Sequence, residues 1–154
     1  MPSKSYEELS DLEKLQKQWH KLSGLHTREE WSAAIVRAAT AAEIAANHAV
    51  RAEFEAQSKL DPAFIDSLLR WANGLTGKLD KLLIPLTATH KQKHKAIKAL
   101  SKSAAEINKK RNAVVHQGEF CNEMEAVAII DASREFITKL VQLYKINFAL
   151  KERK

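Results

Sequence analysis

The sequence predicts an all-α protein, an antiparallel bundle of four to six helices that forms a single domain over residues 1–154. Apolar residues recur at steps of three and four along most of the chain, which places them on one face of a helix. Only four glycines and three prolines interrupt the 154 residues, so the helices should be long. Asp61 and Asn122 stand where apolar patterns begin, and both residue types favour the N-cap of a helix.

Caps and turn residues divide this pattern into successive predicted helices. Residues 5–22 form the first helix, which is either a docking arm or part of the core. Thr27 is the predicted N-cap of the longest helix, because Glu30 follows at the spacing of a capping box, and this helix reaches about Ser58. The first helix should end at Ser23-Gly24, and a third helix should run from Asp61 to Asn73-Gly74. A short helix should follow from Gly77 and end before Pro85. The next helix should end at Gly118, and the last should start at Asn122.

The composition is typical of a globular protein in water, with 45% hydrophobic and 29% charged residues. The single cysteine, Cys121, cannot form an intramolecular disulfide, which favours a reducing compartment. The first ten residues lack the apolar core of a signal peptide, and no apolar run approaches the ~20 residues that a membrane span needs. We therefore expect a cytoplasmic protein that makes no membrane contact.

The segment from Ile97 to Gly118 has an interrupted apolar stripe. The stripe consists of Ile97, Leu100, Ala104, Ile107 and Val114. Its missing member is position 111, where the sequence has Arg111. Removing an unpaired charge from water costs roughly several kcal/mol, so an arginine on such a stripe should have a partner. The alternative is a partly exposed arginine whose head group reaches water.

The predicted partner of Arg111 is Glu43, in the alanine-rich second helix. Glu43 is the only charged residue between Arg37 and Arg51. We expect an ion pair between Glu43 and Arg111, with hydrogen bonds from Asn47 or Asn112. The alternative is a Glu43 side chain that faces solvent on the outside of the bundle. Asn47 lies one helical turn from Glu43 and shares its face.

Positive charge is concentrated just before Arg111. From His90 to Arg111 there are eight lysines or arginines and one acid, a net charge of +7 in a chain of net charge +6. Such a segment favours binding to a polyanion, although a solvated helix face is the alternative. The candidate residues for binding such a polyanion are Lys102, Lys109, Lys110 and Asn47. His90 and His94 have a spacing that suits a metal, but no third ligand lies nearby in the sequence, so we expect no metal site and no cofactor.

The residues Arg111-Asn112-Ala113-Val114-Val115-His116 resemble the R-x(4–6)-H motif of the HEPN superfamily. The resemblance extends over roughly residues 28–148, with the motif ahead of an amphipathic last helix, and the ending His116-Gln117-Gly118 is similar to abortive-infection-type branches. It implies a homodimeric, metal-independent endoribonuclease of a toxin, antiphage or RNA-processing system. For toxin members it also implies a neutralising partner protein. Some members only bind RNA or nucleotides.

The candidate catalytic residues are Arg111, Asn112, His116 and Glu43. Histidine is suited to removing a proton from a 2′-hydroxyl near neutral pH, and arginine to binding the charge that develops on the phosphate. On one helix Arg111 and His116 lie roughly 140° apart, so two motifs facing each other in a homodimer would form a more complete site. The interface is expected on the last helix or on the alanine-rich one. The open alternatives are a non-catalytic HEPN-like module and a helical adaptor in which Arg111 only pairs with Glu43.

Overall fold

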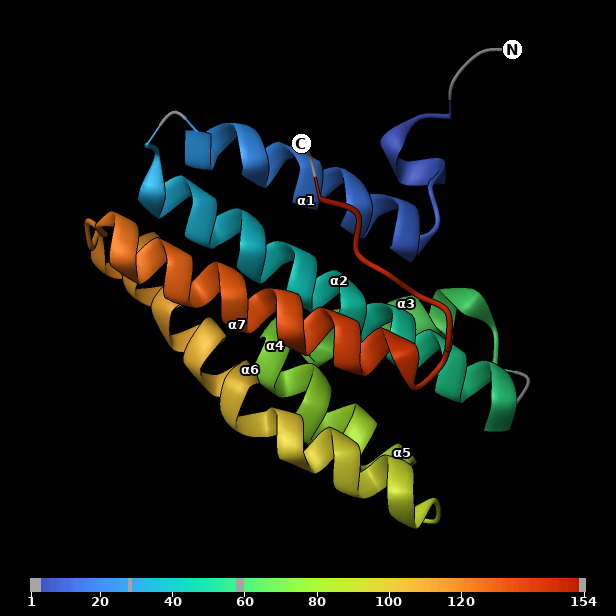
Figure 1. Cartoon of the computed structure of the whole chain (residues 1–154). Coiled ribbons are helices and arrows are strands. Elements are labelled where there is room, and N and C mark those ends of the chain that lie inside the picture. Colours follow the sequence, from blue (N-terminus) through green and yellow to red (C-terminus); the bar gives the residue numbers. More distant parts are fainter. Residues whose placement is uncertain (1–3, 28, 58–59, 153–154) are drawn as a thin grey trace.

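The computed structural model describes residues 4–27, 29–57 and 60–152, and every regular element within them is helical (Figure 1). The prediction of an all-α helical bundle is therefore confirmed. None of the described helices is long and apolar enough to cross a membrane. The elements in chain order are a 3-10 turn (Tyr6–Glu8), α1 (Asp11–Thr27), α2 (Trp31–Gln57), α3 (Pro62–Trp71), α4 (Gly74–Gly77), a π-helical segment (Lys78–Leu83), α5 (Ile84–Leu86), α6 (Lys91–Gln117) and α7 (Glu123–Gln142).

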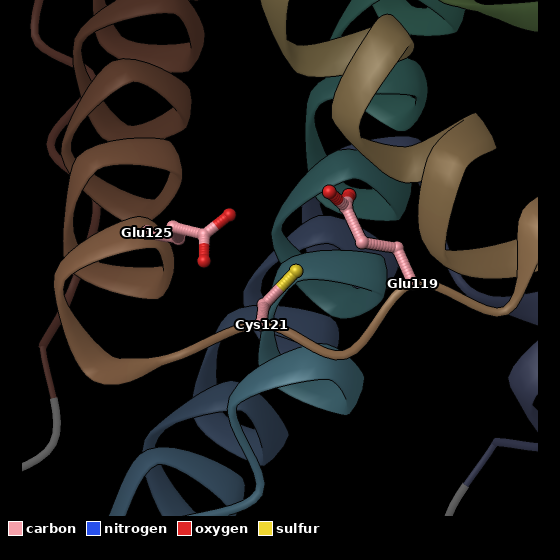
Figure 2. A group of neighbouring side chains, drawn as sticks. All are labelled: Glu119, Cys121 and Glu125. Carbon is pink, nitrogen blue, oxygen red and sulfur yellow. The ribbon is translucent and has the colours of Figure 1, made fainter.

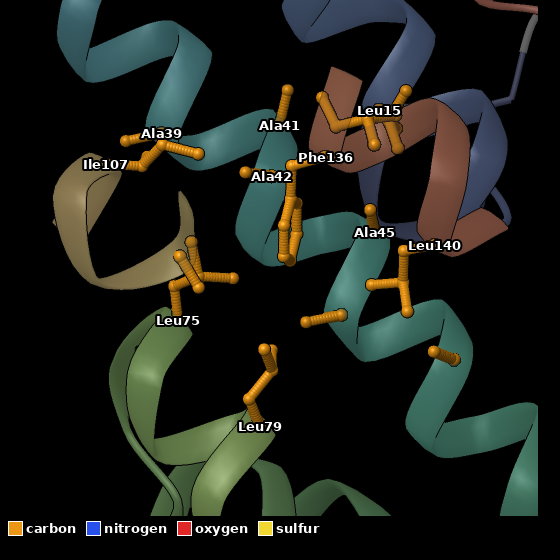
Figure 3. Packing of buried hydrophobic residues seen from close by; sticks show 14 of the residues in the cluster. Leu15, Ala39, Ala41, Ala42, Ala45, Leu75, Leu79, Ile107, Phe136 and Leu140 are labelled. Atoms are coloured by element: carbon orange, nitrogen blue, oxygen red, sulfur yellow. The ribbon is translucent and has the colours of Figure 1, made fainter. Parts of the chain in front are cut away.

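Helix α2 forms the centre of the bundle. It packs against α1 on one side and α7 on another, and also contacts α6 and the π-helical segment. Eight of its alanines are buried, and side chains from the surrounding helices lie close to them (Figure 3). Because an alanine side chain is a single methyl group, neighbouring helices can approach the α2 backbone closely. The larger side chains that complete this core are Leu15, Leu75, Leu79, Ile107, Phe136 and Leu140.

Helix α1 belongs to the core rather than forming a docking arm. Leu15, Trp19 and Leu22 are all buried. The Trp19 indole N–H donates a hydrogen bond of 2.9 Å to the Glu152 carboxylate, so the C-terminal segment lies against α1 (Figure 1). The first helix and the last described residues therefore stabilise each other.

The predicted boundaries around α1 are wrong at both ends. The helix begins at Asp11 rather than near residue 5, and it continues through Ser23-Gly24 to Thr27. Thr27 is thus the last residue of α1 and not the N-cap of α2. An internal glycine costs about 1 kcal/mol of helix stability, which the burial of Leu22 in the core offsets.

The predicted end of a helix before Pro85 is also wrong, whereas three other predicted helix boundaries agree with the structure. Helical structure continues to Leu86, because Pro85 falls in the first turn of α5, where its missing N–H is not needed. The Asp61 side chain accepts a hydrogen bond of 3.2 Å from the backbone of Ala63. The remaining agreements are Gly118, which ends α6 with a left-handed φ of 66°, and the Asn122 side chain, which caps α7.

A buried carboxylate connects α2 to α6 and to the end of α7. Glu53 is only 1% exposed. Its carboxylate accepts hydrogen bonds from Lys93 Nζ at 2.9 Å, Tyr144 Oη at 2.8 Å and Gln57 Nε2 at 2.6 Å. Burial opposes ionisation of Glu53, but these three donors outweigh it and leave the pKa of Glu53 below its usual value. Burial and the adjacent Glu53 both raise the pKa of Tyr144.

This arrangement predicts a loss of stability in acid. A carboxylate whose pKa is lowered by folding stabilises the native state above its unfolded pKa of about 4.3, and this contribution disappears as the pH falls through the folded pKa. Glu53→Gln should lower the free energy of unfolding at pH 7 by about 1–3 kcal/mol, and the deficit should shrink towards pH 3. Urea denaturation across this pH range measures both effects. Glu55→Gln, at an exposed position, is the control, and a deficit independent of pH would contradict the prediction.

Candidate functional site

The Arg–His motif lies at the C-terminal end of α6, where the chain turns towards α7. Arg111 continues the stripe of buried Ile107 and is itself half-buried. Its guanidinium donates a hydrogen bond of 3.2 Å from Nη1 to Oδ1 of the neighbouring Asn112. Asn112 is therefore the hydrogen-bond acceptor for Arg111. Val114, the next member of the stripe, packs against the core.

Arg111 differs in its partners from the half-buried Arg51 and Arg134, whereas the half-buried Arg37 likewise bonds to a neutral side chain, that of Gln18, at 2.7 Å. Arg51 contacts two carboxylates, at 3.0 Å and 2.7 Å, and Arg134 contacts two, both at 2.6 Å. Among the residues that the structure describes, no carboxylate lies within ion-pair distance of Arg111, and its hydrogen-bond partner is the neutral Asn112 amide. The positive charge of Arg111 is therefore not neutralised within the described chain, and its remaining N–H donors are open to an anion.

The predicted ion pair between Glu43 and Arg111 is wrong, because Glu43 pairs with Lys78. The Lys78 ammonium is 2.8 Å from Glu43 Oε1 and 3.4 Å from the carbonyl oxygen of Ala72. Lys78 is only 4% exposed, so its charge needs this carboxylate. Glu43 thus has a structural role that accounts for its position on α2.

The sequence contained a signal for this pair that was overlooked. Lys78 falls on the apolar stripe of Leu75, Leu79 and Leu82, at the same spacing that singled out Arg111. Two cations therefore interrupted apolar stripes, and only one could pair with Glu43. Spacing along a helix shows which side chains point inward, but it does not show which of them meet.

The other residue expected beside Glu43, Asn47, is half-buried on α2. Its Oδ1 atom is buried and has no hydrogen-bond partner within residues 4–27, 29–57 and 60–152. Oδ1 is a hydrogen-bond acceptor, and a phosphate oxygen is also an acceptor. This atom therefore cannot donate a hydrogen bond to a phosphate, and a role of Asn47 in RNA binding stays a prediction.

His116 is exposed on the last turn of α6, two residues before Gly118. The backbone N–H groups of Gly118 and Glu119 both donate to the carbonyl oxygen of Ala113, which fixes the direction in which the chain leaves the helix. The imidazole of His116 is consequently held at a defined helix end and is open to solvent. It can exchange a proton with a bound molecule at that end.

Large apolar side chains are exposed around His116. Phe120 is 95% exposed and Met124 is 80% exposed. Val115, on the last turn of α6, is also exposed, whereas the exposed Val127 lines a cavity with Trp19 and Arg134. We call Val115, Phe120 and Met124 the α6–α7 apolar surface. Exposed apolar groups gathered in one region are typical of a surface that contacts another macromolecule.

The three lysines expected to bind RNA have different environments. Lys110 lies 3.1 Å from the Glu119 carboxylate and also bonds to Glu125, and these carboxylates raise the pKa of Lys110. Lys102 and Lys109 are exposed, and neither forms an ion pair with any residue that the structure describes. Lys110 thus stabilises the turn between α6 and α7, whereas Lys102 and Lys109 are accessible to a ligand.

The same turn contains a group of possible metal ligands that the sequence analysis missed. Side-chain ligand atoms of Glu119, Cys121 and Glu125 lie within 4.8 Å of one another (Figure 2). Lys110 bonds to both carboxylates and supplies the positive charge that they require. Burial raises the pKa of the Cys121 thiol, which disfavours the thiolate that a metal needs. We therefore interpret this group as an ion-pair cluster that connects α6 to α7.

Comparison with known proteins adds no assignment: no family model, no curated protein and no solved structure matches the chain. The candidate site therefore depends on its own geometry. That geometry places Arg111, Asn112 and His116 at one helix end, with Lys102 and Lys109 earlier on the same helix. Glu43 and Asn47 lie on α2 and make no hydrogen bond or ion pair with them within the described residues.

The corrected pairing predicts different stabilities for two alanine variants. Glu43→Ala should lower the free energy of unfolding by about 3 kcal/mol, because it leaves the buried Lys78 ammonium without its carboxylate. Arg111→Ala should cost no more than about 1 kcal/mol, because no carboxylate loses a partner. Chemical denaturation of both variants measures these values.

A double variant, Glu43→Leu/Lys78→Met, is the control for this prediction. Replacing both charges with apolar groups of similar size should recover most of the loss seen in Glu43→Ala. Equal destabilisation by Glu43→Ala and Arg111→Ala would mean that the two residues are coupled after all.

Proposed function

We propose that this chain is a metal-independent endoribonuclease of HEPN type, in which Arg111 binds the scissile phosphate and His116 transfers protons. The observation that supports this function best is the half-buried Arg111 guanidinium, which lacks a carboxylate among the described residues and lies on the same helix end as the exposed His116. A half-buried cation whose charge no carboxylate of the described chain neutralises favours an anionic ligand.

The proposed reaction needs only these groups and the RNA. His116 accepts the proton of a 2′-hydroxyl, whose oxygen attacks the adjacent phosphorus. The bond from phosphorus to the 5′-oxygen breaks, and that oxygen receives a proton from a second, protonated imidazole. The products are a 2′,3′-cyclic phosphate and a 5′-hydroxyl. Arg111, oriented by the Asn112 amide, donates hydrogen bonds to the phosphate oxygens as charge develops on them.

One chain provides a single His116 for a reaction that uses two proton-transfer groups, so the proposed active form is a homodimer. Of the two expected interfaces, the alanine-rich one is disfavoured because eight alanines of α2 are already buried inside the chain. The α6–α7 apolar surface remains exposed beside His116 and supplies apolar area for a second copy. Pairing through this surface would bring the two motifs together.

A non-catalytic RNA-binding module is the second candidate function. Lys102 and Lys109 are exposed and would attract RNA whether or not His116 takes part in chemistry. The third alternative, an adaptor in which Arg111 only pairs with Glu43, loses its basis because Glu43 pairs with Lys78. A cytoplasmic location, a role in toxin or antiphage systems and a neutralising partner protein are extensions of the ribonuclease proposal.

The ribonuclease proposal predicts cleavage without metal and its loss in one histidine variant. Wild-type protein incubated with labelled RNA in EDTA should produce fragments that end in a 2′,3′-cyclic phosphate. His116→Ala should reduce the cleavage rate at least about 1,000-fold, the order of contribution of general acid–base groups, while RNA binding changes little. His90→Ala replaces an exposed histidine at the opposite end of α6 and should cleave like wild type. Intact RNA at high protein concentration would leave only the binding function.

The proposed homodimer predicts that charge on the α6–α7 apolar surface separates the subunits. Phe120→Glu/Met124→Glu should give a monomer in analytical ultracentrifugation and abolish cleavage, because two charges would be desolvated at the interface. Ile146→Glu, at another exposed apolar position, should leave the dimer intact. A purified heterodimer of wild type with His116→Ala should be nearly inactive if one imidazole acts as base and the other as acid. Half or more of the wild-type activity would show that one motif suffices.

A further inference from the structure

The lysines of α6 fall into two groups. Lys93 and Lys110 are half-buried and pair with carboxylates. The other five are exposed and form no ion pair with any residue in the described part of the chain. These five are Lys91, Lys95, Lys98, Lys102 and Lys109. We call them the α6 lysine stripe.

The five lysines lie on one line along the helix, and His116 continues it. At about 100° per residue, their spacing of four, three, four and seven residues keeps them within a sector of about 60°. His116 follows Lys109 by seven residues, or about two turns, and falls in the same sector. The buried residues of α6 point to the opposite side, so the whole line faces solvent. With a rise of 1.5 Å per residue, the line from Lys91 to His116 is about 38 Å long.

The charge along this line is almost entirely positive. Helix α6 contains a single acidic residue, Glu106, which lies at the edge of the stripe. The carboxylates near the helix that could neutralise the stripe are used elsewhere: Glu53 pairs with Lys93, and Glu119 and Glu125 pair with Lys110. The chain thus pairs its acids with the inner lysines and leaves the outer ones available.

We propose that the α6 lysine stripe binds the phosphate backbone of single-stranded RNA and leads it to His116. The inference rests on the proposed function for its end point, but the binding surface itself is independent of catalysis. Successive lysines from Lys91 to Lys102 lie ~4.5–6 Å apart along the axis, and Lys109 follows ~10.5 Å further on; flexible lysine side chains can reach successive phosphates from such positions. About five phosphates on one side of the cleaved bond would be neutralised.

Single-stranded RNA fits the stripe better than a duplex does. A strand within a duplex winds around the duplex axis, so it moves away from a straight row of lysines after a few nucleotides. A flexible single strand can follow the whole row. A membrane surface is also disfavoured, because helices that bind lipid carry bulky apolar side chains beside their basic residues. On α6 itself, the exposed residues next to the stripe are instead small or polar, such as Ala99, Ala105 and Gln92.

The test compares two sets of three substitutions with the same change in charge. Lys95→Gln/Lys98→Gln/Lys102→Gln removes the centre of the stripe. Lys17→Gln/Lys21→Gln/Lys145→Gln removes three exposed lysines outside α6. The probe is a 12-nucleotide 2′-O-methyl RNA, which has no free 2′-hydroxyl and so cannot be cleaved by the proposed reaction. Binding is measured from 50 to 300 mM salt on full-length proteins whose folding is checked by circular dichroism.

The stripe variant should bind the RNA at least about tenfold more weakly at low salt. The magnitude of its slope of log K against log salt should fall by about 2, since each lost phosphate contact removes about 0.7. The control set should weaken binding less than about twofold. Equal losses in both sets would overturn the inference, because net charge alone would then explain binding. Equal affinity for a 12-base-pair duplex would overturn the choice of single strands. Reduced binding to phosphatidylserine vesicles with unchanged RNA binding would assign the stripe to membranes instead.

Failure of this inference can be separated from failure of the proposed function. If the stripe set loses RNA binding but wild type never cleaves RNA, the binding surface stands and the ribonuclease proposal fails. If wild type cleaves RNA and both sets retain its kcat/KM and affinity, the ribonuclease proposal stands and the stripe does not guide the substrate.

Discussion

The close packing of helices against the alanines of α2 is the constraint on which this structure depends. Each alanine contributes little apolar area, so the stabilising contacts come from larger residues such as Phe136 and Leu140, which lie beside the alanines of α2 (Figure 3). This close approach requires α1, α6 and α7 to keep their positions around α2. Larger side chains at the buried positions would force the helices apart.

The bundle treats its inward-pointing charges in two ways. Glu53 and Lys78 each have an oppositely charged partner, Lys93 and Glu43 respectively, so their burial is compensated. Arg111 points to the same side of α6 as the core residues but has only a neutral amide beside it among the described residues. The fold gives Glu53 and Lys78 oppositely charged partners, whereas Arg111, like the half-buried Arg37 beside Gln18, has a neutral one.

Much of the fold was predictable from local sequence, and two of the failures share one cause. Caps at Asp61 and Asn122 and the helix end at Gly118 depend on a few neighbouring residues, and all three were predicted. The end of α1 and the partner of Glu43 depend on which surfaces meet in the folded bundle. A glycine that usually ends a helix is tolerated when burial stabilises that helix, and a carboxylate pairs with whichever buried cation the packing brings to it. Of the candidate site, the sequence identified Arg111, Asn112 and His116 but could not show that Glu43 belongs to another pair.

The two faces of α6 explain why the proposed site would need a second chain. Arg111 lies on the inner side of the helix, while His116 and the α6 lysine stripe lie on the outer side, roughly 140° away. An RNA strand bound along the α6 lysine stripe would reach His116 of the same protein chain. It would have to bend around α6 to contact Arg111 of that chain. A second α6 placed against the exposed α6–α7 apolar surface would present its own Arg111 and His116 to that same phosphate. Under the proposed function, one chain would thus position the strand and receive the proton, and the pair of chains together would enclose the charge that develops at the bond being broken.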